Sequence, residues 1–290
     1  MDKKLEHSRI LTHRGLENGR ENWFSESTYE AFQDQLSRSF GLEFDPNFIR
    51  DGRIVISHDG NLARVTGGVD IRPLAEVSPD EMPLLLENGR LCFFEELMDL
   101  IRRSPSKINA MHLKGGFQEP AYLQILIENI QQHASDMLDR FLIFDVKPET
   151  ARLLLTTLPT LHLAPSVAHP YDIQRYNDVV KGTLISVDEA LEYRDQGLYD
   201  WVWLDEWDLT DTDGGNKSLY TKEVFDRLRS VGYKIALVTP ELHGTSPGLL
   251  GGEAHPDATP QERLFGRIRE IIALEPDAIC TDWPEQFTTD

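Results

Sequence analysis

Short apolar runs and helix-period segments alternate along this chain from one end to the other. Strict alternation of strands and helices favours a parallel sheet, because parallel neighbours need a crossover, which is usually a helix. Eight such units predict a closed (β/α)₈ barrel of the TIM type. The predicted strands are Ser8–Thr12, Ser39–Phe44, Lys107–Leu113, Phe141–Phe144, Leu161–Ala164, Trp201–Leu204, Lys234–Val238 and Ala278–Thr281.

The chain length agrees with a single domain spanning residues 1–290, since one α/β barrel commonly occupies about 250 residues. A doubly wound open sheet is the alternative, but the glycine-rich turn expected after its first strand is absent. Arg53–Ser57, after the turn at Asp51–Gly52, is an accessory strand. The predicted helices are Ser27–Ser37, Phe93–Arg103, Gln118–His133, Pro148–Thr157, Val187–Gln196, Thr221–Ser230 and Pro260–Leu274.

The formal charge of −20, from 49 acidic and 29 basic residues, argues against two classes of partner. Such a surface repels nucleic acid phosphates and anionic lipid headgroups. A small anionic substrate remains compatible, because a bound cation and a few basic residues reverse the field locally. We therefore expect a small-molecule substrate and no nucleic acid partner.

The cysteines and the amino-terminal residues give an expectation for the cellular compartment of the protein. The first residues lack the apolar stretch of about 7–15 residues that is typical of a signal peptide. No run approaches the roughly 18 apolar residues of a membrane span. Cys92 and Cys280 lie in apolar surroundings, far apart in sequence, which favours two buried free thiols. We expect a cytoplasmic protein without stable membrane insertion, and the sequence leaves its oligomeric state open.

Polar residues stand where the predicted strands end, which is the face of a barrel that carries catalytic groups. His13, Glu43, Asp45 and His112 all fall at such ends. Glu43 and Asp45 share one face of their strand, because side chains alternate with a period of two. Buried carboxylates must be paired, metal-bound or protonated. A divalent metal site and a salt bridge to a nearby base both account for the pair, and we favour the metal.

Two histidines, His13 and His58, start short polar motifs. His13 precedes Arg14, whose guanidinium can hold two phosphate oxygens. His58 precedes Asp59, which can fix the tautomer of the imidazole. Both imidazoles can act as general acid or base near neutral pH. A capping pair and an Asp-Gly turn are the alternatives without a catalytic role.

The third and seventh predicted strands add candidates to the same face. His112 and Lys114 share a strand face: His112 is a third metal ligand or an ordinary buried histidine, and Lys114 is a cation for a phosphate. Glu241 and His243 follow the seventh strand and could bind metal or substrate. They begin the segment Glu241–Thr259, which is rich in glycine and proline. This segment is consistent both with a lid over the site and with a surface insertion.

The order of these motifs resembles the glycerophosphodiester phosphodiesterase family. T-H-R-G matches the opening H-R-G of the family, and G-L-E-F-D matches its E-x-D metal motif. Ser25–Phe32 is similar to P-E-N-T-x-x-A-F, with Glu26 in the place of its acid. Arg50–Gly68 is similar throughout to the block D-G…V…H-D…L-x-R-x-T-G, and C-T-D-W-P-E resembles the closing T-D-x-P.

The resemblance implies a (β/α)₈ barrel that hydrolyses a glycerophosphodiester to an alcohol and a phosphomonoester such as sn-glycerol 3-phosphate, in lipid metabolism. Its implied site has His13 and His58 as the acid–base pair, Arg14 and Lys114 on the phosphate, and one divalent metal ion, Mg, Ca, Mn or Zn, on Glu43, Asp45 and His112.

The chain departs from the family pattern in two places. His112 stands where the third-strand motif E-x-K has its acid, which favours a softer metal such as zinc or manganese. A-L-V-T-P-E replaces the usual W-T-V-N of the seventh strand, so the alcohol of the substrate stays open. Alternatives are a sister enzyme that acts on a sugar phosphodiester or releases a cyclic phosphate, and a catalytically weak metal- or ligand-binding barrel.

Overall fold

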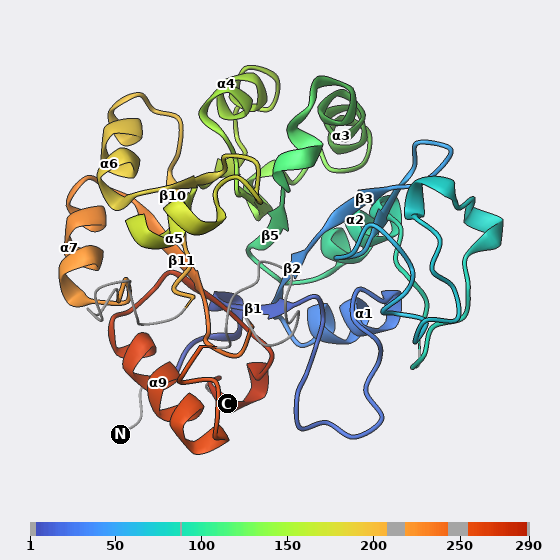
Figure 1. Cartoon of the computed structure of the whole chain (residues 1–290), viewed down its shortest axis with the longest axis horizontal. Helices are drawn as coiled ribbons and strands as arrows, with labels where there is room; N and C mark the ends of the chain where they lie inside the picture. Colours follow the sequence, from blue (N-terminus) through green and yellow to red (C-terminus); the bar gives the residue numbers. More distant parts are fainter. Residues whose placement is uncertain (1–3, 88, 208–217, 243–254, 289–290) are drawn as a thin grey trace.

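A ring of helices surrounds a central parallel sheet in the computed structural model, which describes residues 4–87, 89–207, 218–242 and 255–288 (Figure 1). The strands of the main sheet are β1 (Ile10–His13), β2 (Gly41–Phe44), β5 (Asn109–His112), β6 (Phe141–Phe144), β7 (His162–Leu163), β8 (Ser166–Val167), β9 (Leu184–Ile185), β10 (Trp201–Leu204), β11 (Lys234–Val238) and β12 (Ala278–Thr281). The helices are α1 (Tyr29–Ser37), α2 (Phe94–Arg103), α3 (Pro120–His133), α4 (Pro148–Thr157), α5 (Pro170–Tyr176), α6 (Val187–Asp195), α7 (Lys222–Ser230) and α9 (Gln261–Ala273).

The segment 162–167 closes the sheet on itself. Its first part, β7, pairs with β6, and its second part, β8, pairs with β10. Between the two parts, Ala164 N–H donates to the carbonyl of Ile143 at 2.9 Å, and the carbonyl of Pro165 accepts from Trp203 N–H at 3.1 Å. This extended segment thus acts as one barrel strand, bonded on both sides. The predicted (β/α)₈ barrel is confirmed, with β9 as an extra short strand beside β8.

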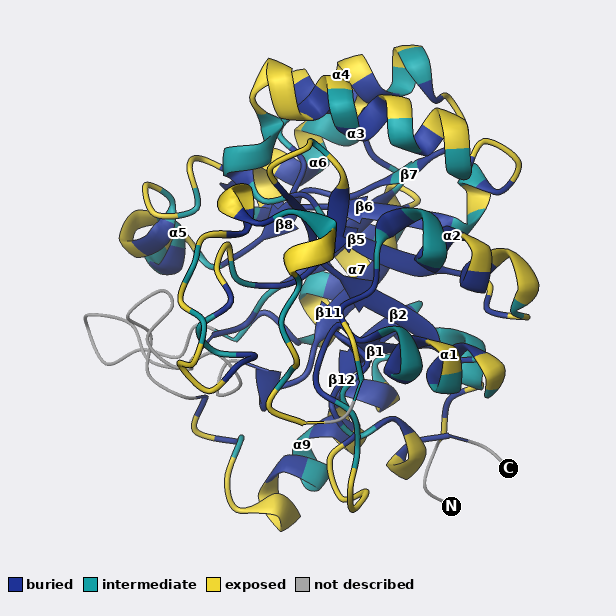
Figure 2. Cartoon of the chain, turned by 90° about the vertical axis from the view of Figure 1, so that its right-hand side faces the viewer, coloured by how far each residue is buried: buried dark blue, intermediate teal, exposed yellow. Residues whose placement is uncertain are grey.

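Two apolar layers follow from the alternation of side chains along each strand. Leu11, Ala110, Leu142, Ala236 and Ala278 belong to the cluster inside the barrel. Their neighbours in sequence, such as Ile10, Ile143 and Ile279, belong to the larger cluster between sheet and helices. Figure 2 shows the strands and the inward faces of the helices buried, with exposed residues on the outer faces.

Local sequence signals explain where the helices begin. The side chain of Thr28 accepts from Ala31 N–H at the start of α1, and Ser186 with Glu189 forms a capping box at the start of α6. The predicted helices are all present, with ends within three residues of those expected. The sequence reasoning missed α5, which buries only Asp172 and Tyr176 and therefore has no apolar period. Among the described residues, no helix is both long and apolar enough to cross a membrane.

A hairpin explains the accessory strand predicted near residues 53–57. β4 (Ile54–Ile56) pairs antiparallel with β3 (Pro46–Phe48), which directly follows β2. The hairpin brings the chain back to its start, so that Ser57 N–H donates to the carbonyl of Asp45 at 2.9 Å. The side-chain amide of Asn47 then donates to the carbonyls of Ser57 and Asp59, at 3.2 Å each. The residue between them, His58, is thereby held beside the end of β2.

Gly41 allows β2 to lie close to its neighbours inside the barrel. A Cβ atom at this position would lie 2.2 Å from the Ile108 carbonyl oxygen and 2.6 Å from a methyl carbon of Leu11. We expect Gly41→Ala to lower the free energy of unfolding by about 1–3 kcal/mol, since the backbone of Ile108 must shift. Urea unfolding followed by circular dichroism measures this change.

Gly266 is the matched control for Gly41, because a Cβ on this helical residue of α9 meets nothing within 4 Å. Gly266→Ala is expected to raise the free energy of unfolding by about 0.5–1 kcal/mol through helix propensity. If the two substitutions changed stability alike, the packing argument for Gly41 would be wrong.

Glu206, two residues after the end of β10, connects α9 to the barrel. Its carboxylate accepts from the backbone N–H groups of Leu219 (2.5 Å) and Tyr220 (2.9 Å), and from Arg267 of α9 (2.9 Å). His255 Nε2 lies 3.6 Å away. Burial raises the pKa of Glu206, but these partners outweigh it and bring the pKa from 4.5 to about 2. The carboxylate is therefore a stabilising group in its charged form.

The lowered pKa of Glu206 predicts how stability depends on pH. A depressed folded-state pKa stabilises the protein above the unfolded pKa of 4.5, and this contribution is lost as the pH falls toward 2. We expect Glu206→Gln to cost about 3 kcal/mol at pH 7 and progressively less below pH 4.5. Urea unfolding at pH 7, 4.5 and 3.5 measures it. Glu270→Gln, on an exposed partner of the same Arg267, is the control; parallel pH profiles for wild type and Glu206→Gln would contradict the prediction.

Candidate functional site

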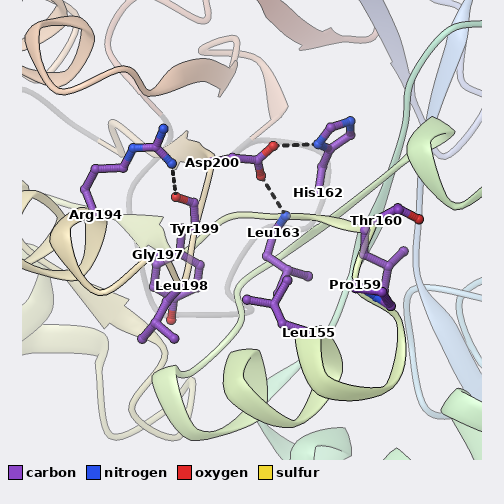
Figure 3. A pocket seen from close by; sticks show the side chains of 11 residues that line it. Leu155, Pro159, Thr160, His162, Leu163, Arg194, Gly197, Leu198, Tyr199 and Asp200 are labelled. Atoms are coloured by element: carbon purple, nitrogen blue, oxygen red, sulfur yellow. Dashed lines mark hydrogen bonds and ion pairs between the residues drawn. The ribbon is translucent and has the colours of Figure 1, made fainter.

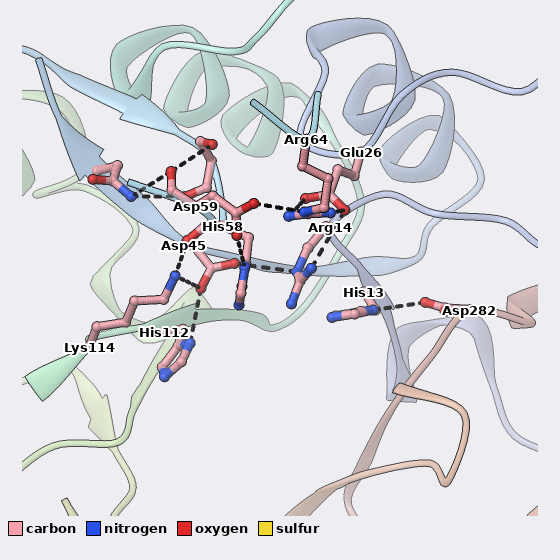
Figure 4. Close-up of polar contacts among 12 residues, drawn as sticks. His13, Arg14, Glu26, Asp45, His58, Asp59, Arg64, His112, Lys114 and Asp282 are labelled. Carbon is pink, nitrogen blue, oxygen red and sulfur yellow. Dashed lines mark hydrogen bonds and ion pairs between the residues drawn. The ribbon is translucent and has the colours of Figure 1, made fainter. Parts of the chain in front are cut away.

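The site lies at the carboxyl ends of the barrel strands, where alternation places polar residues on the inner face. His13 continues the inward position of Leu11 in β1, and His112 continues that of Ala110 in β5. Glu43 and Asp45 continue the inward position of Gly41 in β2. Figure 4 shows Asp45 in contact with Arg14, Lys114 and His112, while His13 contacts Asp282.

Each of the two predicted acid–base histidines has a carboxylate on the same ring nitrogen. His13 Nδ1 lies 2.9 Å from Asp282 Oδ1, and His58 Nδ1 lies 2.8 Å from Asp59 Oδ1. Burial lowers the pKa of His58 to about 4, and the neighbouring Asp45 and Asp59 offset this only in part. Both rings are thus oriented by an acid, and that of His58 is neutral at physiological pH.

Asp45 is the centre of the polar contacts. Its Oδ1 atom lies 3.1 Å from Lys114 Nζ and 2.9 Å from His112 Nδ1, and its Oδ2 atom lies 3.6 Å from Arg14 Nε. Burial raises the pKa of Asp45, but Lys114, His58 and His112 outweigh it, so that the pKa lies well below its usual range. The predicted alternative, a salt bridge to a nearby base, is therefore present for Asp45, with Lys114 and Arg14 as the bases.

Glu43 differs from its neighbour Asp45. It is buried, and its Oε2 atom has no hydrogen-bond partner among the described residues. Burial and the nearby charge of Asp45 raise its pKa. Atoms of Glu43, Asp45 and His112 all lie within 4.8 Å of one another, a spacing that could hold a metal ion. A buried carboxylate oxygen without a hydrogen-bond partner is a candidate ligand for a cation.

A second layer of charges supports Arg14 and His58. Arg64 binds both carboxylate oxygens of Glu26, at 2.5 and 2.8 Å, and its Nε donates to Asp59 at 2.7 Å. Arg14 lies 3.5 Å from the same Glu26. Burial raises the pKa of Glu26, but Arg64 and Arg14 outweigh it and the pKa is lowered. Glu26 thus links the H-R-G motif to the H-D motif.

His112 is held on three sides. Its Nδ1 faces Asp45, while its Nε2 lies 3.3 Å from Asp145 Oδ2. Its ring stacks on Phe144, with centroids 4.7 Å apart and planes 8° apart, and Phe144 stacks on Trp203. Burial lowers the pKa of His112, but the hydrogen bonds to Asp145 and Asp45 outweigh it and raise the pKa to about 9.

The structure brings all seven sequence-predicted site residues together, and three more belong with them. Asp282 continues the inward position of Cys280, so the alternation of side chains along β12 could have predicted that it faces the site. Arg64 lies in the long motif around His58 but contacts Glu26 across 38 positions of sequence. Asp145 follows the inward residue Phe144, so alternation alone points it outward, yet its positive φ of 66° turns it toward His112.

The predictions for the seventh strand have a mixed outcome. Glu241 is buried after β11, where its Oε1 atom accepts from the hydroxyls of Thr239 and Thr281 and from Asp282 N–H. It therefore supports the segment that carries Asp282. His243 and most of the suggested lid Glu241–Thr259 lie outside the described residues.

A pocket at the opposite end of the barrel is separate from this site (Figure 3). It lies at the amino ends of β7 and β10, and its lining includes Leu155, His162, Arg194, Tyr199 and Asp200. Asp200 accepts from His162 Nδ1 at 2.5 Å and from Leu163 N–H at 3.2 Å. These bonds join the beginnings of two strands. Since barrel chemistry belongs to the carboxyl ends, we assign this histidine–carboxylate pair to stability.

Comparisons with known structures agree with the fold. The glycerophosphoryl diester phosphodiesterase from Parabacteroides distasonis is 19% identical, with a TM-score of 0.64, over 98% of this chain and 84% of its own. The glycerophosphodiester phosphodiesterase from Thermotoga maritima is 17% identical, with a TM-score of 0.59, over 98% of both chains. An Oleispira antarctica phosphodiesterase in complex with its product sn-glycerol-3-phosphate is 16% identical, with a TM-score of 0.62, over 96% of this chain and 94% of its own.

Sequence comparisons give the family. A mouse (Mus musculus) protein, lysophospholipase D GDPD3, is 37% identical over 87 residues, which are 29% of this chain and 24% of the relative's length. The model of the glycerophosphoryl diester phosphodiesterase family matches residues 13–161, a range that contains all seven predicted site residues. This chain therefore belongs to the glycerophosphoryl diester phosphodiesterase family, a family of phosphoric diester hydrolases.

Proposed function

We propose that the protein is a metal-dependent phosphodiesterase that hydrolyses a small glycerophosphodiester to an alcohol and a phosphomonoester such as sn-glycerol 3-phosphate. One observation carries the proposal: two imidazoles, each with a carboxylate on Nδ1, lie beside the Glu43–Asp45 pair at one end of a barrel. The Oleispira relative, which holds sn-glycerol-3-phosphate, supports this product. Cytoplasmic action in glycerophospholipid breakdown is part of the same proposal.

The residues fit a divalent cation held by Glu43, Asp45 and His112. Glu43 and Asp45 are both buried, and each has an oxygen without a hydrogen-bond partner among the described residues. Acids outnumber bases around the site, so an anionic phosphodiester would be repelled by the protein groups alone. A bound cation would neutralise the phosphate charge and lower the pKa of the attacking hydroxyl.

The two histidines divide the proton transfers. We assign the base to His58, because its lowered pKa keeps the imidazole neutral: Nε2 takes the proton of the hydroxyl next to the phosphodiester as that oxygen attacks phosphorus. His13 gives a proton to the alcohol oxygen as its bond to phosphorus breaks. Arg14 and Lys114 orient the phosphate oxygens. Water then opens the resulting cyclic phosphate. In this second step His13 takes the proton from water, and His58 gives its proton to the ring oxygen that leaves phosphorus.

Product analysis tests the proposal. We would incubate the protein with sn-glycero-3-phosphocholine and Mg²⁺, Ca²⁺, Mn²⁺ or Zn²⁺ in turn, and follow phosphorus by ³¹P NMR. The expected product is sn-glycerol 3-phosphate. A cyclic phosphate as the final product would favour the sister enzyme. No turnover of this substrate, of sugar phosphodiesters or of bis-p-nitrophenyl phosphate, despite metal binding, would favour the binding barrel and overturn the proposal.

A specific surface feature favours a second candidate substrate, a lysophospholipid. Val69, Ile71, Leu84 and Leu86 are 69–94% exposed, and all lie between β4 and α2, in the segment that also carries His58 and Arg64. This segment extends beyond the helices at the right of Figure 1. Leu86 N–H donates to the Val65 carbonyl, one residue from Arg64. An acyl chain of an uncharged or zwitterionic aggregate suits such a surface, and the mouse relative is named a lysophospholipase D.

Substitution of this apolar surface separates the two substrates. We expect the combined change Val69→Ser, Ile71→Ser, Leu84→Ser and Leu86→Ser to reduce hydrolysis of micellar lysophosphatidylcholine by about tenfold or more, since each lost contact removes part of a buried side chain's transfer energy. Hydrolysis of glycerophosphocholine should not change. Leu153→Ser, at an exposed position of α4 outside this segment, is the control. Equal rates of the two variants on micelles would exclude the acyl contact.

A further inference from the structure

His112 occupies its position with a fixed orientation. Its ring lies flat on Phe144, which in turn lies flat on Trp203 at 3.8 Å between centroids. The two ring nitrogens point in opposite directions, with Nδ1 2.9 Å from Asp45 Oδ1 and Nε2 3.3 Å from Asp145 Oδ2. Nδ1 is therefore the nitrogen that faces Asp45, and Nε2 is the nitrogen that faces Asp145.

This is the arrangement of an imidazole that binds a metal through one nitrogen. Such a ligand almost always donates its other N–H to a carboxylate or carbonyl, which fixes the tautomer and makes the ligand more basic. A ring nitrogen of His112 lies within 4.8 Å of ligand atoms of Glu43 and Asp45, and Nδ1 is the nitrogen that faces Asp45, 2.9 Å from its Oδ1 atom. Asp145, which is buried and reaches His112 because of its positive φ, is the carboxylate on the far side.

We propose that His112 and Asp145 together form the third ligand position of the metal centre, with His112 Nδ1 as the ligand and Asp145 as its positioning residue. With a cation on Nδ1, the proton of Nδ1 would have left to solvent, and Nε2–H would donate to Asp145. The inference rests on the metal site of the proposed function but not on its substrate.

Metal preference follows from the ligand type. A carboxylate at position 112 would give a centre of oxygen ligands only, which suits Mg²⁺ and Ca²⁺. With His112, one ligand is an imidazole nitrogen. The negative charge of Asp145 then contacts this imidazole and not the cation itself. The centre should therefore prefer Mn²⁺ or Zn²⁺ to Mg²⁺ or Ca²⁺.

Metal titrations of single and double variants test the pairing. Isothermal titration of the metal-stripped full chain with Mn²⁺, Zn²⁺, Mg²⁺ and Ca²⁺, without substrate, should show Asp145→Asn lowering Mn²⁺ and Zn²⁺ affinity by about 10–100-fold. His112→Glu should shift the preference toward Mg²⁺ and Ca²⁺. In the His112→Glu background, Asp145→Asn should cause no loss, because the new carboxylate does not need Asp145 and is repelled by it.

Pulsed electron paramagnetic resonance gives a readout that a merely structural role would not change. Bound Mn²⁺ should show coupling to an imidazole ¹⁴N nucleus in wild type and in Asp145→Asn, and none in His112→Glu. Asp257→Asn, on another buried acid that is paired with Arg263 outside the site, controls for loss of a buried charge, and thermal unfolding checks that each variant folds.

Three results would overturn the inference: wild-type Mn²⁺ without ¹⁴N coupling, equal losses for Asp145→Asn with and without His112, or losses that Asp257→Asn reproduces. Because no substrate enters these measurements, a protein that binds Mn²⁺ through His112 but hydrolyses nothing would refute the proposed function and leave this inference standing.

Discussion

Asp45→Asn is expected to lower phosphodiesterase activity by about 10³-fold or more, because the loss of a metal ligand removes several kcal/mol of charge stabilisation in the transition state. The same change removes the acid that Lys114, His112 and Arg14 share. Removal of one charged partner from a buried ion pair lowers the free energy of unfolding by about 3–5 kcal/mol. The activity and the urea unfolding midpoint should therefore fall together.

Glu43→Gln separates the two effects of Asp45→Asn. Glu43 has an oxygen without a hydrogen-bond partner among the described residues, and burial raises its pKa, so the neutral amide relieves a buried charge. We expect a comparable loss of activity and of metal affinity at an unchanged unfolding midpoint. A Glu43→Gln variant with full activity and full metal affinity would show that the acids serve the fold rather than a metal.

His13→Ala and His58→Ala form the second large prediction. Each should lower kcat by about 10²–10⁴-fold, which is the usual contribution of a positioned general acid or base. Because the two groups act in one step, the double variant should lose much less than the product of the single losses. Measurement of kcat and KM with glycerophosphocholine should show the loss mainly in kcat.

His162→Ala is a matched control for both histidine variants. His162 also has a carboxylate on Nδ1, that of Asp200, but this pair lies at the amino ends of the strands. Its removal should leave kcat unchanged. If either His13→Ala or His58→Ala kept near-wild-type activity, or if His162→Ala lost as much, the acid–base assignment would fail.

The barrel could be predicted from the sequence because its strands are apolar and its helices are periodic. The closure through residues 162–167 was less visible, since this strand is bonded to different neighbours in its two halves. The helix α5 was missed because it is short and buries only Asp172 and Tyr176, so the position of its proline and cap, rather than an apolar face, sets its start.

The site residues could be predicted where the sequence of a single strand shows polar side chains at its end. Glu43 and Asp45 are two residues apart in an apolar run, and His13 and His112 end such runs. Asp145 was not predicted, because its own left-handed backbone conformation breaks the alternation of side chains after Phe144. The bond between Arg64 and Glu26 joins two loops that no local pattern connects.

Metal removal and replacement in the wild-type protein tests the central claim most directly. The protein would be stripped with EDTA, dialysed, and assayed for sn-glycerol 3-phosphate release from glycerophosphocholine as Mn²⁺ is added back. Our account predicts negligible release without metal and recovery that saturates at one Mn²⁺ per chain, with no recovery for Glu43→Gln. Full release by the stripped protein, or equal recovery by Glu43→Gln, would contradict a catalytic metal on Glu43 and Asp45.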